Sequence, residues 1–205
     1  MIAGDSLDGL CQLEGEVGPL ECLLEIPSDG IRGLALVAHP HPLQGGNMYH
    51  KLPQTLARSF KELGCVVVRM NTRGVGGSAG TYAEGLGEAR DWLRVYQWAR
   101  QHYPVGPVYL AGFSFGAYVM SLVAQEVACR RLVLLGTAVR SFSVPTVPAN
   151  TLVMHGQDDE VAPLALVMDW AKPQGIAVVV LPGVGHYFHQ QLGVIRTWVQ
   201  LTCQF

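Results

Sequence analysis

The chain has 205 residues, of which 49% are hydrophobic and 15% are charged, and its formal net charge is −2. This length fits one domain over 1–205 with a large core. The charge balance provides no basic stripe, which argues against a nucleic-acid partner. The sequence has no apolar run of the roughly 18–20 residues that a membrane span needs, and its N-terminus lacks the pattern of a signal peptide.

Predicted strands and helices alternate along the chain. An N-terminal hairpin is expected over 10–15 and 20–26, separated by a glycine–proline turn. Short apolar runs predict buried strands over 34–38, 65–70, 108–110, 132–135, 152–154 and 177–181. Helical periodicity predicts helices near 48–63, 84–102, 115–128, 163–171 and 189–202. This order implies an open, mostly parallel sheet with helices on both faces, and functional residues in the loops that follow the strands.

Ser114 lies in such a loop, between a predicted strand and a predicted helix. Gly112 and Gly116 flank it in the pattern G-x-S-x-G, which suits a sharp strand-to-helix turn that presents a nucleophile. The turn places the N–H of Phe115 at a helix N-terminus, where it can donate to an anion. In a glycine-rich chain this pattern alone does not identify a nucleophile, so the residues elsewhere in the chain decide whether Ser114 is one.

A serine hydroxyl needs a base, and the base needs an orienting acid. Asp158 and Asp159 follow one later strand, and His186 follows the next. The chain order is therefore Ser, Asp, His, the order of α/β-hydrolases. The residues themselves leave both aspartates open as the acid.

At these motifs the sequence resembles the α/β-hydrolase superfamily, in particular small lidless bacterial members related to dienelactone hydrolase. The stretches that carry the resemblance are 39–47, 71–78, 112–116 and 185–189. The resemblance implies an α/β-hydrolase fold without a lid domain. The family's acid motif falls on 155–163, with Ala162 where the family has Val, and selects Asp159 over Asp158. Dienelactone hydrolases have a cysteine nucleophile where this chain has Ser114.

The oxyanion hole of such an enzyme needs two N–H donors. Phe115 is expected to supply one, and the loop after 34–38 the other. Since Pro40 and Pro42 have no N–H, the candidates are His41, which the resemblance favours by its position, and Leu43.

The aromatic residues beside the site predict an apolar acyl or aryl pocket formed by Phe113, Phe115, Tyr187 and Phe188. Arg73, in a glycine-rich loop, is a candidate for binding a substrate carboxylate, with a loop-pinning role as its alternative. The link over 136–150 is too short and irregular for a lipase lid, so the site is expected to be open and to suit small soluble esters.

These residues predict a carboxylesterase-like serine hydrolase that forms an acyl-enzyme and needs neither cofactor nor metal. Its partner is a small-molecule ester. A thioesterase, an amidase, a peptidase and a non-catalytic binding module remain alternatives. The five cysteines are scattered without a C-x-x-C pair, which favours the reducing cytoplasm. The sequence does not indicate an oligomeric state.

Overall fold

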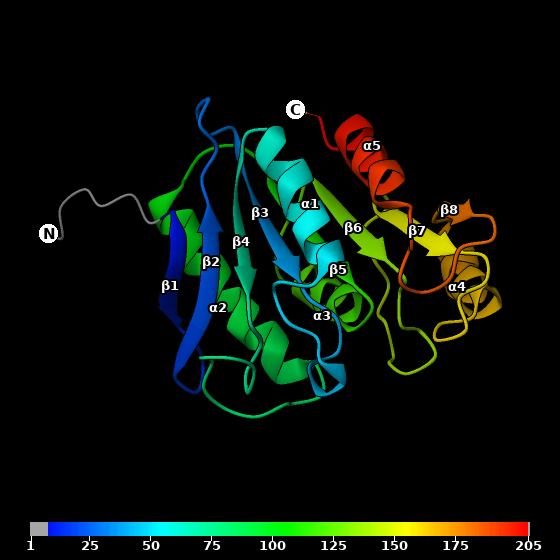
Figure 1. Cartoon of the computed structure of the whole chain (residues 1–205), viewed down its shortest axis with the longest axis horizontal. Helices are drawn as coiled ribbons and strands as arrows, with labels where there is room; N and C mark the ends of the chain where they lie inside the picture. Colours follow the sequence, from blue (N-terminus) through cyan, green and yellow to red (C-terminus); the bar gives the residue numbers. More distant parts are fainter. Residues whose placement is uncertain (1–7, 205) are drawn as a thin grey trace, which may run out of the picture.

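The structure is a computed structural model that describes residues 8–204, and its central element is an eight-stranded sheet (Figure 1). Residues 1–7, which begin the segment considered for a signal peptide, and residue 205 lie outside this range. The strands, in the spatial order β1-β2-β4-β3-β5-β6-β7-β8, are β1 Gly9–Glu14, β2 Pro19–Glu25, β4 Cys65–Met70, β3 Gly33–Ala38, β5 Val108–Phe113, β6 Arg131–Leu135, β7 Leu152–Gly156 and β8 Val178–Leu181.

The hairpin β1–β2 is antiparallel, and β2 pairs antiparallel with β4; every other neighbouring pair is parallel. The parallel strands are mostly apolar because both faces of the sheet are covered. In β3, for example, Leu34 and Leu36 belong to one hydrophobic cluster, while Ala35 and Val37 belong to the other.

Five α-helices cover the two faces. The helices are α1 Lys51–Glu62, α2 Leu86–His102, α3 Phe115–Val123, α4 Leu164–Ala171 and α5 Leu192–Thr202, and short 3₁₀ turns occupy η1 Pro42–Gln44 and η2 Lys172–Gln174. Helices α1 and α5 pack on one face, and α2 and α3 on the other (Figure 1). Helix α4 adds to the face of α2 and α3 through Val167 and Ala171.

The predicted elements agree with the structure except at some ends. The strands predicted over 108–110 and 152–154 continue to Phe113 and Gly156, and several helices are shorter than predicted. The helix predicted over 115–128 stops at Val123, because the following turn is closed by tighter three-residue hydrogen bonds at Gln125 and Glu126. The helix predicted over 189–202 starts at Leu192, because Phe188 and Gln190 have positive φ angles of 49° and 62°, which a right-handed helix does not allow.

The open, mostly parallel sheet predicted from the sequence is confirmed, with its antiparallel hairpin and helices on both faces. The segment between β6 and β7 contains neither helix nor strand, so no lid domain is inserted there. The loops after β3, β5, β7 and β8 meet at the carboxyl edge of the sheet, where open α/β folds form their sites.

Candidate active site

Ser114 forms the turn between β5 and α3. Its φ and ψ angles of 56° and −116° are rare for a residue with a Cβ atom and store backbone strain. The two flanking glycines permit the turn: a Cβ on Gly112 would lie 2.2 Å from the Gly116 carbonyl oxygen, and one on Gly116 would lie 2.5 Å from that of Ala38. The sharp turn places the Ser114 hydroxyl at the edge of the sheet.

His186 comes from the loop after β8 and reaches the serine. Its Nε2 lies 3.0 Å from Ser114 Oγ, and its Nδ1 lies 2.7 Å from Asp159 Oδ2. All three side chains are largely buried. The Asp159 carboxylate can only accept, so Nδ1 carries the proton and Nε2 presents its lone pair to the serine hydroxyl. This is the tautomer that a general base requires.

The structure distinguishes the two candidate aspartates. The Asp159 side chain is fully buried, whereas Asp158 is exposed, and its N–H donates to Val184 O. Asp159 Oδ1 accepts the N–H groups of Val161 and Ala162 at 2.9 and 2.7 Å. Both oxygens of the Asp159 carboxylate are therefore fixed, one by its own loop and one by His186.

The electrostatics keep Asp159 ionised. Burial alone raises the pKa of this carboxyl, but hydrogen bonds from His186 and from the Ala162 N–H outweigh burial, so the net pKa is lowered. His155 is fully buried beside it: its Nε2 lies 2.7 Å from Ala162 O and 3.3 Å from Asp159 Oδ2. Burial lowers the pKa of His155, so it packs there as a neutral ring.

The loop after β3 supplies the candidate oxyanion donors. The Leu43 N–H donates to Nδ1 of the His41 ring at 3.3 Å, and the Leu43 side chain is 71% exposed. His41 lines the cavity in front of Ser114, and Leu43 does not. Phe115 begins α3 directly after Ser114, so its N–H lies at the helix N-terminus beside the nucleophile.

The cavity at Ser114 is small, about 40 Å³, which is room for a few water molecules. Its lining combines the loops after β3, β5 and β8: Pro40, His41, Gln44, Gly45, Gly46, His50, Phe113, Ser114, His186 and Tyr187. Of the predicted pocket residues, Phe113 and Tyr187 are therefore at the cavity, whereas Phe115 is buried and does not line it. Phe188 is fully buried in the core with Phe113, at a ring distance of 6.4 Å, and its prediction as a pocket residue is not supported by this position.

Arg73 does not reach the cavity either. Its guanidinium pairs with Asp91 at 2.8 Å and Glu16 at 3.0 Å, and donates to Gly87 O at 2.8 Å. The side chain is 6% exposed. These contacts correspond to the loop-pinning alternative, since every bond joins the loop after β4 to the β1–β2 turn or to α2.

His50 is a cavity residue that the sequence reasoning missed. Its ring stacks on Phe113 at 5.5 Å, and its Nδ1 accepts the Leu52 N–H at the start of α1. It falls inside the helix predicted over 48–63, and only the structure places it just before α1, so the sequence held no signal for it. Burial lowers its pKa, and the charges of Lys51 and His186 add to this effect.

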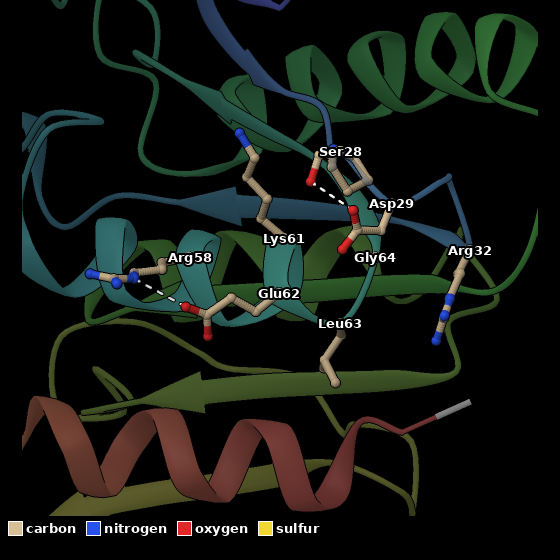
Figure 2. A pocket seen from close by; sticks show the side chains of 9 residues that line it. Ser28, Asp29, Arg32, Arg58, Lys61, Glu62, Leu63 and Gly64 are labelled. Atoms are coloured by element: carbon tan, nitrogen blue, oxygen red, sulfur yellow. Dashed lines mark hydrogen bonds and ion pairs between the residues drawn. The ribbon is translucent and has the colours of Figure 1, made fainter.

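A larger cavity of about 460 Å³ lies at the opposite edge of the sheet, beside the residues that precede β3 and β4 (Figure 2). Its charges are partly paired, with Arg58 on Glu62 at 3.1 Å. Figure 2 shows Arg32 and Lys61 pointing away from one another. Because its charged groups do not converge on one point, we place the candidate chemistry in the smaller cavity.

Within residues 8–204, no group of three or more His, Cys, Asp or Glu side chains is arranged to hold a metal ion. No helix in this part of the chain is long and apolar enough to cross a membrane.

Comparisons with known proteins agree with this architecture. A family model described as the alpha/beta hydrolase fold matches residues 33–150. An uncharacterized protein of Rickettsia prowazekii is 34% identical over 171 residues, which are 76% of this chain and 71% of that protein.

Two solved structures are similar to the chain in both sequence and fold. A Xanthomonas campestris protein described as an a/b serine hydrolase without lid is 34% identical, with a TM-score of 0.91 over 97% of this chain and 94% of that one. An alpha-beta serine hydrolase homologue from Coxiella burnetii is 34% identical, with a TM-score of 0.89 over 97% and 99%.

Proposed function

Because the chain belongs to the α/β-hydrolase family, we propose that it is a serine hydrolase that cleaves small carboxylic esters through an acyl-enzyme on Ser114. The observation that carries this proposal is the continuous hydrogen-bonded chain from Ser114 Oγ through His186 to Asp159. The strained backbone of Ser114 supports it, since such strain persists where function requires it.

The proposed reaction begins when Ser114 Oγ attacks the ester carbonyl and its proton passes to His186 Nε2. The tetrahedral oxyanion accepts N–H groups from Phe115 and His41. His186 then gives the proton to the departing alcohol, and a water molecule hydrolyses the acyl-enzyme by the same steps. Asp159 holds the His186 tautomer and stabilises the charged imidazole. These steps use side chains, backbone and water alone.

The cavity supports a small acyl group as the substrate. Its volume of about 40 Å³ leaves no room for a long chain inside the protein. The walls on one side are the rings of Phe113, His50 and Tyr187, which suit an apolar or aromatic group. The absence of a helix in 136–151 leaves the site accessible to soluble esters.

We also propose a reducing, cytoplasmic location, because all five cysteines are free: Cys11, Cys22, Cys65, Cys129 and Cys203. The proposed partner is the small-molecule ester alone, without nucleic acid or membrane.

The test is hydrolysis of p-nitrophenyl acetate and butyrate by the wild type and by Ser114→Ala, with fluorophosphonate labelling read by mass spectrometry. We expect activity and a label on Ser114 in the wild type, and neither in the variant. A folded wild type with neither activity nor label would reject the proposal in favour of a binding module. Thioester and amide substrates in the same assay would show which acyl class is preferred.

A further inference from the structure

A buried histidine links the loop after β3 to the loop after β4. His39 is fully buried. Its Nε2 lies 3.0 Å from the Thr72 N and 3.2 Å from the Thr72 hydroxyl, and its Nδ1 lies 2.6 Å from the Pro40 carbonyl oxygen. Since the Thr72 N–H can only donate and the Pro40 carbonyl can only accept, both bonds require one tautomer, with the proton on Nδ1.

The tautomer of His39 persists at neutral pH. Burial lowers the pKa of His39 to about 4, against the opposing effect of the Pro40 carbonyl. The ring is therefore neutral where the proposed reaction runs, and it keeps one donor and one acceptor. A buried ring with both nitrogens engaged fixes the orientation of its partners.

The bond to Pro40 orients a whole peptide group. The described residues contain no cis peptide bond, so the Pro40–His41 peptide is trans, and its C=O and N–H point in opposite directions. Holding the Pro40 carbonyl against the His39 ring turns the His41 N–H to the other side. His41 lines the cavity in front of Ser114.

The other hydrogen bonds of the loop after β3 fix the shape of its turn but do not orient the turn relative to the sheet. The His41 carbonyl accepts the N–H groups of Gln44 and Gly46 at 3.1 and 3.0 Å, which closes the turn on itself. His39 instead connects the turn to the loop after β4 through Thr72. On the other side, Gly116 of α3 packs against the carbonyls of residues 38 and 39, so the loop and the Ser114 turn are held in one register.

We infer that His39 is a positioning residue that sets the direction of the His41 N–H and thereby completes the oxyanion hole. This inference rests on the proposed function. His39 itself does not line the cavity, so it acts through the peptide of Pro40 and His41. The N–H is needed only when negative charge develops on the carbonyl oxygen, and its misdirection should therefore lower kcat and leave KM unchanged.

Three substitutions separate the two bonds of the ring. In His39→Asn the side-chain amide N–H can replace Nδ1 and keep the bond to Pro40. In His39→Gln the longer side chain can replace Nε2 as the acceptor for Thr72 but cannot hold Pro40. His39→Phe keeps a ring and removes both bonds. The matched control is Ser59→Ala, which removes the hydrogen bond of another buried side chain, to Thr55 O in α1, away from the site.

We expect His39→Gln and His39→Phe to lose about 10–100-fold in kcat, part of the about 10²–10³-fold that a whole oxyanion donor is worth. His39→Asn should stay within about fivefold of the wild type, and Ser59→Ala should match it. Assays run well below each variant's unfolding midpoint. The second readout is the affinity for an alkyl trifluoromethyl ketone, whose hemiketal oxygen occupies the oxyanion hole. That affinity should fall in parallel with kcat/KM.

The inference is overturned if His39→Gln keeps wild-type kcat, if KM rises in place of a fall in kcat, or if the trifluoromethyl ketone binds all variants alike. If His39→Phe does not fold, the comparison of His39→Asn with His39→Gln tests the inference. Failure of the proposed function is distinguishable, because the wild type itself would then show no Ser114-dependent hydrolysis or labelling.

Discussion

Replacing Asp159 by asparagine should move the ring proton of His186 from Nδ1 to Nε2. Oδ1 of Asp159 accepts two backbone N–H groups, so the asparagine must place its oxygen there and its NH₂ group toward His186. His186 Nδ1 then has to accept, which moves the ring proton to Nε2. Nε2 lies 3.0 Å from Ser114 Oγ, and once protonated it cannot take the serine proton.

The expected loss in kcat for p-nitrophenyl acetate is about 10⁴-fold, the value for this substitution in an established serine protease triad. It corresponds to about 5.5 kcal/mol of transition-state stabilisation. The variant should keep its fold, because the amide preserves the loop's hydrogen bonds. Steady-state kinetics at neutral pH measure the loss.

The matched control is Asp158→Asn, the exposed neighbour, which should remain within about twofold of the wild type because surface changes of this kind have small effects. The reasoning would be refuted if Asp159→Asn kept more than a tenth of the activity, or if Asp158→Asn lost as much.

Four further predictions concern stability and pH. Ser114→Gly should unfold about 2–4 °C above Ser114→Ala, because both lack the hydroxyl and only alanine keeps about 1 kcal/mol of strain at a φ of 56°; calorimetry of the pair decides. Gly116→Ala should lower both the unfolding midpoint and kcat, since its Cβ would meet two backbone carbonyl oxygens at 2.5 and 2.6 Å; an unchanged midpoint would contradict this. Arg73→Met should cost about 3–5 kcal/mol in urea unfolding by leaving the buried Asp91 unpaired, with KM unchanged for a substrate that carries a carboxylate. For His39, burial lowers the folded pKa to about 4 from 6.5. Its contribution to stability is therefore complete above pH 6.5 and declines by about 3 kcal/mol as the pH falls to 4. The gap in unfolding free energy between the wild type and His39→Asn should be smaller at pH 4.5 than at pH 7.

The fold was predictable because its signals are local. Strands such as 65–70 are short and mostly apolar, with Arg69 as the one charged residue, and the structure places β4 over these same residues. The order of Ser114, Asp159 and His186 along the chain was likewise readable, since parallel strands bring the loops at their carboxyl ends to one edge.

The side-chain contacts were less predictable because they depend on distant partners or on backbone direction. Arg73 pairs with Asp91 and Glu16, which lie in other elements. Phe188 is two residues from His186, but its positive φ of 49° belongs to a turn in which its ring enters the core. Adjacency in sequence therefore did not place it at the cavity. His39 and His155 form hydrogen bonds with residues of loops. No spacing of residues in the sequence predicts these bonds.

The proposed triad is divided between the middle and one side of the sheet. Ser114 follows β5, which has β3 and β6 as neighbours, whereas Asp159 and His186 follow β7 and β8, the two outermost strands on one side. Outer elements open to solvent more readily than central ones in native-state fluctuations. An opening of β8 would separate base from nucleophile while the central strands stay paired. Loss of hydrolysis on warming should therefore precede loss of secondary structure, which makes turnover a sensitive gauge of local unfolding at this side of the molecule.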